Sequence, residues 1–219
     1  MVRLLYEDAE LVAVDKPSWA VVHRARGAAG AVVLAEVLAR QVGGPVFPVH
    51  RLDRQTSGVM VFARTSSAAS VLAGDVREGR WRKRYLGLCR GVVGEAREVD
   101  HPVADGERRL PARTDFDPLE AFCGRYTLVR AFPRSGRRHQ VRYHLKHIAH
   151  PLIGDANYGQ GAINRFFKET FGLSRMFLHA EALRIVHPRR AEHLSFEAPM
   201  PAELEEVLAR LRIYEGPVL

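Results

Sequence analysis

One carboxylate lies among cationic side chains in the segment 50–58, whose sequence is HRLDRQTSG. Asp53 is flanked by Arg51 and Arg54, and His50 adds a further positive charge when it is protonated. Guanidinium groups beside a carboxylate favour its ionised form, so we expect Asp53 to be ionised at neutral pH. An ionised aspartate suits a nucleophile or a base better than a general acid. Taken alone, the same pattern is also typical of a surface ion pair.

The residues on both sides of this segment favour a functional loop over a surface turn. The chain enters through the apolar residues 47–49, and residues 59–63 (VMVFA) are typical of a buried strand. Residues 56–58 between them predict a turn. Asp53 is therefore expected in a short loop that leads directly into a buried strand.

Length and composition predict one domain with a substantial core. The chain has 219 residues, of which 47% are hydrophobic and 26% charged. No apolar run approaches the roughly 18 residues that a membrane span needs, and the first residues lack the apolar core of a signal peptide. Two cysteines are too few for a disulfide framework or a CxxC zinc site. These features predict a cytoplasmic protein with no membrane partner.

The basic residues are numerous and unevenly distributed. The formal net charge is +8, and only four of the 33 basic residues are lysine. Segment 121–154 contains no acidic residue, and in segment 77–90 six basic residues face only Glu78. Such segregation predicts a positive face that can follow a phosphate backbone, so nucleic acid is the expected partner. A GC-rich genome would also favour arginine codons.

Periodicity predicts strands and helices in one α+β domain. Strands are expected at residues 4–6, 11–14, 59–63, 81–89, 122–132, 177–180 and 183–186, with an extended path at 21–23. Helices are expected from about 33 to 43, near 69–79, at 140–147 and from Pro201 onward. Segment 101–119 carries three prolines and is expected to be a loop or a small excursion. The fold class is therefore α+β, with a mixed, largely antiparallel sheet flanked by helices and loops in a single catalytic domain over 1–219.

Five groups of residues, in this order, resemble the RluA-type family of RNA pseudouridine synthases, which act on ribosomal and transfer RNA without a guide. The groups are DKPS at 15–18 with VH at 22–23, the whole of 50–58, KRY at 83–85 with Gly91, GRRHQVRYHL at 136–145 continued by HPLIGDANYG at 150–159, and LHA at 178–180 with HP at 187–188. The resemblance covers residues 4 to about 200. A single such group would be weak evidence, whereas five in order are specific.

The resemblance implies a role for three side chains in an isomerase that needs neither cofactor nor metal. It implies that Asp53 either attacks the ribose or abstracts its 2′ proton, and both roles stay open here. Tyr85 matches the aromatic residue that holds the detached uracil and helps to remove the proton from carbon 5. Arg142 matches the arginine that pairs with the catalytic aspartate and keeps it ionised.

The resemblance also implies how RNA is bound. The target base has to leave its stack, and Arg51 matches the residue that occupies the vacated space. The other expected RNA contacts are His50, Arg54, Lys83, Arg138 and His139. No basic S4-like module precedes the catalytic domain, so this domain is expected to grip RNA itself. No obligate protein partner is implied.

Within the family, the tRNA-modifying branch is the most similar, through the opening residues 4–18, Asn164-Arg165 and the stretch 171–180. This similarity implies modification of a uridine in the T-stem of tRNA, at position 65, with ribosomal RNA as the alternative substrate. Two positions depart from the family pattern. Trp19 stands where glycine usually follows Lys-Pro-Ser, and Ala149 stands where glycine often precedes His-Pro.

Two other functions compete with the isomerase. A non-catalytic, Arg-rich RNA-binding module would explain the charge, but it would have no need for Asp53, Tyr85 and Arg142 together. A metal-dependent nuclease or phosphoesterase would use the histidines of the basic segment, which are His139, His144, His147 and His150. This segment has no carboxylate to accompany them and no HExxH motif, so no metal site is expected.

Overall fold

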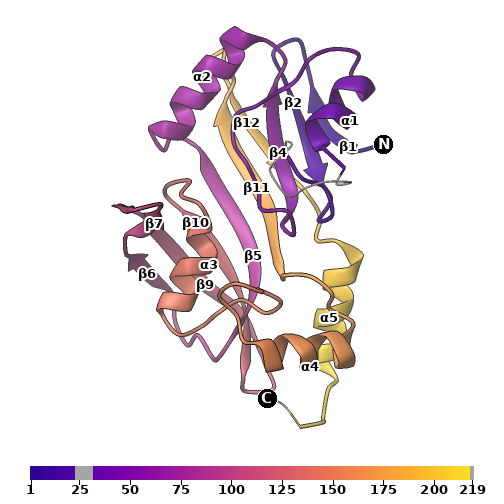
Figure 1. Ribbon diagram of the computed structural model, residues 1–219, viewed down its shortest axis with the longest axis vertical. Helices are drawn as coiled ribbons and strands as arrows, with labels where there is room; N and C mark the ends of the chain where they lie inside the picture. Colours follow the sequence, from indigo (N-terminus) through magenta and orange to yellow (C-terminus); the bar gives the residue numbers. More distant parts are fainter. Residues whose placement is uncertain (23–31, 218–219) are drawn as a thin grey trace. The chain divides into compact units, whose positions relative to one another are not determined.

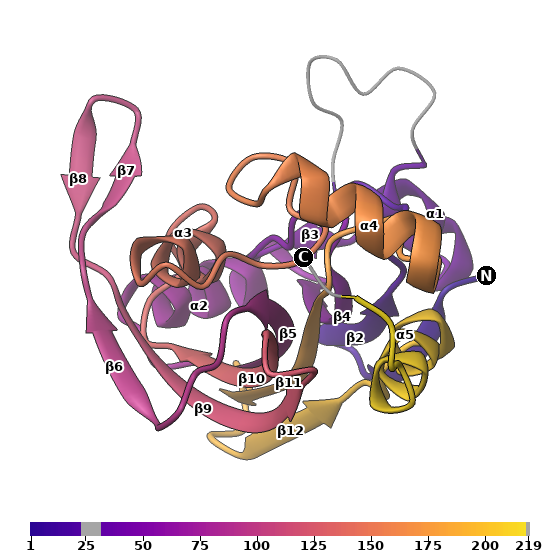
Figure 2. The ribbon, with the colours of Figure 1, turned by 90° about the horizontal axis from the view of Figure 1, so that it is seen from below.

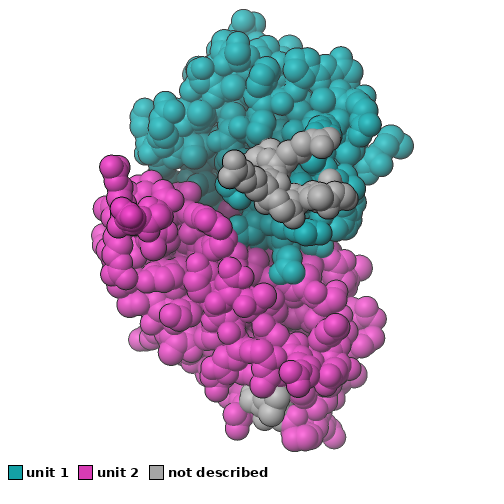
Figure 3. Space-filling model, in the orientation of Figure 1, with its two compact units in different colours: residues 1–83, 180–199 teal, residues 84–179, 200–219 magenta. Residues whose placement is uncertain are grey.

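Residues 57–63, directly after the Asp53 segment, form strand β4 (Ser57–Ala63), and every side chain of this strand is buried. The protein is described by a computed structural model, which places residues 1–22 and 32–217. The described chain divides into two compact units (Figure 3). Unit 1 comprises residues 1–83 and 180–199, and unit 2 comprises residues 84–179 and 200–217 of the described chain.

Unit 1 is a largely antiparallel sheet covered by α2. Its elements are β1 (Arg3–Glu7), β2 (Leu11–Lys16), α1 (Leu34–Gln41), β3 (Phe47–Pro48), β4, α2 (Ser66–Arg77), most of β11 (Leu178–Val186) and β12 (His193–Glu197). The strand order is β1–β2–β4–β11, with β12 paired to β11 and β3 paired to β4 (Figure 1). Ala68 and Leu72 of α2 are buried with residues of β2, β4, β11 and β12, which gives this unit its own core.

Unit 2 holds a second run of antiparallel strands and three helices. Its elements are most of β5 (Arg82–Arg90), β6 (Arg97–Asp100), β7 (Val103–Asp105), β8 (Arg108–Leu110), β9 (Arg113–Phe122), β10 (Tyr126–Pro133), α3 (Gln140–His147), α4 (Gly161–Phe171) and α5 (Ala202–Arg212). The strand order is β5–β10–β9–β6, and β7 and β8 form a separate hairpin (Figure 2). Helices α4 and α5 bury one cluster of apolar side chains against this unit, and α3 packs against another.

The predicted fold class is confirmed, since antiparallel strands are flanked by helices. The helix predicted at 140–147 is confirmed as α3. The helix after Pro201 is confirmed as α5. Its sequence places four apolar residues at i, i+3, i+4 and i+7, which predicts an apolar stripe, and all four are buried: Leu204, Val207, Leu208 and Leu211. A single catalytic domain over 1–219 stays a prediction, because two units that share the continuous strands β5 and β11 are compatible with one domain or two.

Segment 101–119 was predicted to be a loop or a small excursion. The separate hairpin of β7 and β8 is such an excursion, whereas a loop is wrong for residues 113–119, which form most of β9. The three prolines of this segment indicated a loop, because proline is rare inside strands. Pro118 pairs with Val129 next to an irregularity in the β9–β10 ladder, and such a bulge is one of the few places where a strand tolerates proline.

The strand predicted at 122–132 is in fact the end of β9, a tight turn and the start of β10. Cys123 and Gly124 both have positive φ, and the Arg125 N–H donates to the Phe122 carbonyl at 3.0 Å, which is the pattern of a type I′ hairpin turn. Cys-Gly is an uncommon sequence for such a turn. Two further differences are that 177–180 and 183–186 belong to one strand, β11, and that α4 and β12 were not predicted.

The extended path predicted for 21–23 is only partly described. Val21 bridges Val33 at the entrance to α1, whereas His23 lies outside the described residues.

Gly58 fixes how closely β4 approaches β11 at the end of the Asp53 loop. Its φ is +112°, and a Cβ at this position would lie 2.2 Å from the Ala180 carbonyl oxygen. Real Cβ atoms do not approach backbone atoms this closely, so this position requires glycine. The requirement explains why the turn predicted at 56–58 ends on this residue.

We therefore expect Gly58→Ala to lower the free energy of unfolding by more than the roughly 1–3 kcal/mol that a strained φ costs alone. The matched control is Gly43→Ala, because Gly43 also has positive φ but no atom lies within 4 Å of its Cβ position. Urea unfolding of both variants measures the difference. Equal losses in the two variants would show that contact with Ala180 does not matter.

Candidate active site

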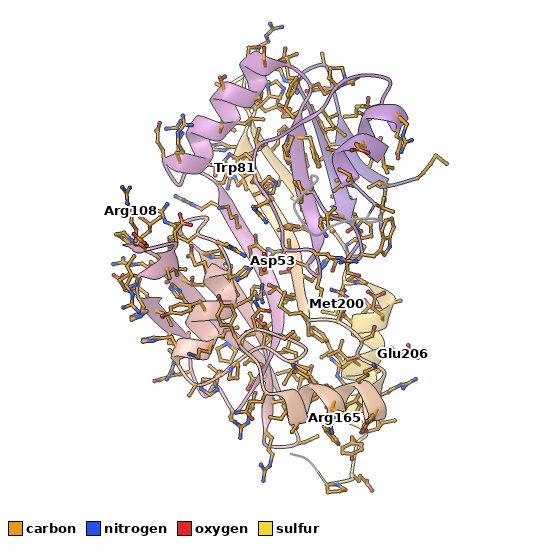
Figure 4. The ribbon with its side chains drawn as sticks, in the orientation of Figure 1. Asp53, Trp81, Arg108, Arg165, Met200 and Glu206 are labelled. Carbon is orange, nitrogen blue, oxygen red and sulfur yellow. The ribbon has the colours of Figure 1, made fainter. Side chains whose placement is uncertain are left out.

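Asp53 lies in the loop that leads into β4 (Figure 4). The loop is tightened by a turn in which the Thr56 N–H donates to the Asp53 carbonyl at 3.0 Å. Leu52 is buried, whereas Arg51 and Arg54 are exposed and Asp53 is half-buried. The buried Leu52 thus anchors the loop, and the side chains of Arg51 and Arg54 face the solvent.

Lys16, at the end of β2, holds the backbone of this loop in place. Its side chain is fully buried, and Nζ donates to the carbonyls of Pro17 at 2.9 Å, Arg54 at 3.0 Å and Thr56 at 2.9 Å. An ammonium group has three N–H donors, so these contacts match its hydrogen-bonding capacity. Two of the carbonyls lie on either side of Gln55, and the position of Lys16 therefore determines the path of the backbone after Asp53.

His50 supports the same loop as a neutral side chain. Its Nε2 accepts a hydrogen bond from the Val61 N–H at 2.9 Å, and its ring packs edge-on against Trp81 at 5.0 Å. Burial, together with the nearby charge of Lys83, lowers the pKa of His50 to about 3. The expected positive charge of a protonated His50 is therefore missing at neutral pH. An RNA contact by His50 stays a prediction.

Lys83 and Tyr85 lie on one face of β5, two residues apart. Burial lowers the pKa of Lys83 to about 8, and its side chain is half-buried. Tyr85 pairs in the ladder with Ala131 of β10 and packs against the core beneath α3, while part of its side chain stays exposed. A ring that is fixed on one side and exposed in part can receive a flat ligand.

Arg142 of α3 is buried and held by a bidentate ion pair. Its Nε donates to Asp155 Oδ2 at 2.7 Å, and its Nη2 donates to Asp155 Oδ1 at 2.8 Å. The guanidinium also lies over the ring of Tyr158, 5.2 Å from its centroid. Burial tends to raise the pKa of Asp155, but the hydrogen bonds from Arg142 and from the N–H groups of Asn157 and Tyr158 lower it overall. Asp155 therefore stays ionised and keeps the guanidinium in place.

The turn that carries Asp155 is itself fixed by α4. Asn164 accepts the Gly154 N–H on Oδ1 at 2.8 Å and donates from Nδ2 to the Asp155 carbonyl at 2.9 Å. Tyr158 is tied in turn to His139, whose Nδ1 lies 3.2 Å from the Tyr158 hydroxyl. Helix α4 thus positions a turn, and the turn positions Arg142.

The structure describes the predicted site residues in two groups. Asp53, His50, Arg51, Arg54 and Lys83 belong to unit 1, whereas Tyr85, Arg138, His139 and Arg142 belong to unit 2. Pairing between Asp53 and Arg142 stays a prediction.

The family motifs in the sequence include Lys16, Asp155 and Tyr158, but the sequence alone did not predict a role for them. A lysine that ends an apolar strand just before a proline was a usable signal for Lys16. For Asp155, the available signal was the first carboxylate after the acid-free segment 121–154.

The four histidines of the basic segment have different partners. His144 is buried between Thr114 Oγ1 and the His101 carbonyl, His150 faces the Arg90 carbonyl, and His147 stacks on His101. Within residues 1–22 and 32–217, no group of three or more His, Cys, Asp or Glu side chains could hold a metal ion. None of the helices in these ranges is long and apolar enough to cross a membrane.

Comparison with known proteins gives the family. The family model described as RNA pseudouridylate synthase matches residues 10–147, which is more than half of the chain. The chain belongs to the RNA pseudouridylate synthase family. Members of this family isomerise uridine in RNA, so the protein is an isomerase that acts on RNA uridine.

Relatives in the family match over most of their length. The tRNA pseudouridine synthase C of Haemophilus influenzae is 34% identical over 95% of this chain and 97% of its own. The protein of the same name from Vibrio cholerae is 35% identical over 90% and 91% of the two chains. Among solved structures, human RNA pseudouridylate synthase domain containing 4 matches with a TM-score of 0.78 over 96% and 93% of the two chains, at 24% identity. This last likeness shows the fold alone.

The hydrogen bonds of Lys16 lead to a prediction about activity. Lys16→Met keeps most of the side-chain volume and removes the ammonium, so the Arg54 and Thr56 carbonyls lose this donor and the Pro17 carbonyl keeps only the Ala20 N–H at 3.4 Å. Each unsatisfied buried carbonyl costs about 1–3 kcal/mol, so the loop should rearrange and turnover at saturating RNA should fall at least tenfold. The control is Lys168→Met, a change at an exposed lysine of α4. Wild-type turnover in a folded Lys16→Met enzyme would show that the loop does not depend on Lys16.

Proposed function

We propose that this protein converts one uridine of tRNA to pseudouridine, at position 65 in the T-stem. The observation that carries the proposal is the similarity to proteins named tRNA pseudouridine synthase C, which extends over nearly the whole of both chains. A match of this extent includes the segments outside the catalytic loop, such as α4, as well as the loop itself. The net charge of +8 supports an RNA substrate.

The reaction breaks the N-glycosidic bond, turns the uracil and rejoins it to the ribose through carbon 5. Asp53 serves as the ionised carboxylate beside the ribose, either as the nucleophile or as the base that takes the 2′ proton. Arg51 and Arg54 on either side of it are exposed. Lys16 keeps the carboxylate in its position by holding the backbone on the far side of the turn.

Tyr85 and Arg142 supply the rest of the chemistry. Tyr85 holds the detached uracil against its ring and assists removal of the proton from carbon 5. Arg142 pairs with Asp53. Because two hydrogen bonds to Asp155 already fix the guanidinium of Arg142, this group needs little reorganisation to form the pair. The scheme asks for no cofactor and no metal. The residues that contact the RNA around the extruded uridine are His50, Arg51, Arg54, Lys83, Arg138 and His139.

Asp53→Asn should abolish pseudouridine formation and leave RNA affinity within a few fold of wild type. The substitution keeps the size of the side chain and removes its charge, whereas affinity for RNA depends mainly on phosphate contacts. Release of tritium from RNA labelled at carbon 5 of uridine measures turnover, and filter binding measures affinity. Near-wild-type turnover in this variant would exclude Asp53 as the catalytic group.

The substrate can be decided by mapping the product. The enzyme is incubated with unmodified tRNA and, separately, with fragments of large-subunit ribosomal RNA, and pseudouridine is mapped in each. We expect modification of the tRNA at position 65 and no other site.

Each alternative has its own outcome in this experiment. Modification of ribosomal RNA alone would keep the isomerase and exclude the tRNA proposal. Binding of RNA without pseudouridine formation in either substrate would favour the non-catalytic RNA-binding module.

A further inference from the structure

Five rings follow one another across unit 2, and only His139 among them has a proposed role so far, as an RNA contact. His139 lies edge-on to Tyr158 with 5.7 Å between centroids, and Tyr158 lies edge-on to Tyr143 at 6.1 Å. Tyr143 stacks with His101 at 5.9 Å, and His101 stacks with His147 at 3.7 Å with only 18° between the planes. We call these five residues the ring row.

The ring row is assembled from three separate segments. Tyr143 and His147 belong to α3, and His139 is the residue before its first turn. Tyr158 comes from the turn that carries Asp155, and His101 comes from the connection between β6 and β7. That connection lies beside α3 (Figures 1 and 2), because the buried His144 binds the His101 carbonyl at 2.8 Å. The row is therefore preformed.

Its side chains are incompletely buried. His101, His139, Tyr143 and Tyr158 are all half-buried, and His147 is exposed. A contiguous series of rings would normally be covered by the core, as the Phe167 and Phe171 rings of α4 are. Here each side chain keeps part of its surface exposed, although one face of His101 is stacked on His147 and one face of Tyr158 is covered by Arg142.

Positive charge borders the row. Arg137, Arg138 and Lys146 are exposed on or next to α3, and Arg109 of β8 is close enough to help lower the pKa of His101, after the larger effects of burial and of His147. Among the acidic groups of this region, Asp100 pairs with Arg113 at 2.8 Å, and Asp105 and Glu107 lie in the β7–β8 hairpin. Cations around half-exposed rings are the pattern of proteins that stack unpaired bases and bind the phosphates between them.

We propose that the ring row binds nucleotides of the RNA substrate that unstack together with the uridine that is modified. Its rings stack on the bases, and Lys146, Arg109 and Arg137 bind the phosphates. The Arg142 guanidinium lies over Tyr158, the second ring of the row after His139, so the strand runs from this proposed catalytic residue of unit 2 along α3. This inference rests on the proposed RNA substrate, and it identifies the surface that receives the RNA beyond the target uridine.

The test separates rings from charges. Tyr143→Leu and His147→Ala remove a ring, whereas Tyr143→Phe and His147→Phe keep a flat ring in place. Dissociation constants for unmodified tRNA are measured at several salt concentrations. We expect the two ring-removing variants to bind at least about fivefold more weakly with an unchanged salt slope, and the two phenylalanine variants to stay within about twofold of wild type.

Lys146→Met serves as the charge control. It should weaken binding and reduce the salt slope by about one, because one phosphate contact is lost. In the ring-removing variants KM should rise and kcat at saturating RNA should stay at the wild-type value, which a defect in folding or chemistry would not produce.

Wild-type affinity in both ring-removing variants overturns the inference. Equal losses in the leucine or alanine variant and its phenylalanine counterpart also overturn it, because the ring would then not be the group that binds. Because His147 is exposed, its pair of variants decides the matter even if Tyr143→Leu does not fold.

If wild-type enzyme modifies ribosomal RNA fragments and not tRNA, the same affinities are measured with those fragments. The substrate proposal then fails, and the ring row is still tested.

Discussion

A single buried ammonium group determines the shape of the loop on which this enzyme is proposed to depend. Lys16 lies at the end of a strand in the core of unit 1, and its three hydrogen bonds go to backbone carbonyls, two of which flank the residue after Arg54. A buried cation destabilises the fold unless its N–H donors are hydrogen-bonded. Moving the loop away from Lys16 would therefore cost free energy. Gly58 adds a second constraint, because only a residue without Cβ lets β4 approach Ala180 this closely.

In unit 2 a buried carboxylate supports a cation, whereas in unit 1 a buried cation supports the loop that carries a carboxylate. Here the residue with a proposed catalytic role is the cation, Arg142, which is proposed to pair with Asp53, and its buried support is the carboxylate of Asp155. A buried ion pair contributes little to stability unless its geometry is good and its remaining hydrogen bonds are made. Asp155 meets both conditions, since it binds Arg142 through both oxygens and also accepts the N–H groups of Asn157 and Tyr158. The result is a guanidinium group whose orientation is fixed before any substrate arrives.

The structure also sorts the basic residues that the sequence presents as one positive segment. Arg142 is neutralised by Asp155, and Arg134 pairs with Asp115 on the surface. Arg137, Arg138 and Lys146 are exposed, and they lie beside the half-buried rings of α3. The number of arginines in the sequence therefore overstates the charge available to RNA, whereas the arrangement of cations around rings makes the remaining charge more specific.

The sequence by itself determined the features that depend on neighbouring residues. The Asp53 loop, the strand after it, the helix at 140–147 and the apolar stripe of the last helix follow from local periodicity and turn residues. The family follows from motifs whose members are consecutive. The proline-containing strand β9 was missed because its stability comes from pairing with β10 and β6, which local propensity does not report.

Only the tertiary structure decided which distant groups meet. Lys16 reaches carbonyls 38 and 40 residues away, Arg142 reaches a carboxylate 13 residues away, and His101 reaches His147 from another element altogether. These contacts form because the sheets and helices first bring their segments together, and no pattern within any one segment specifies the partner.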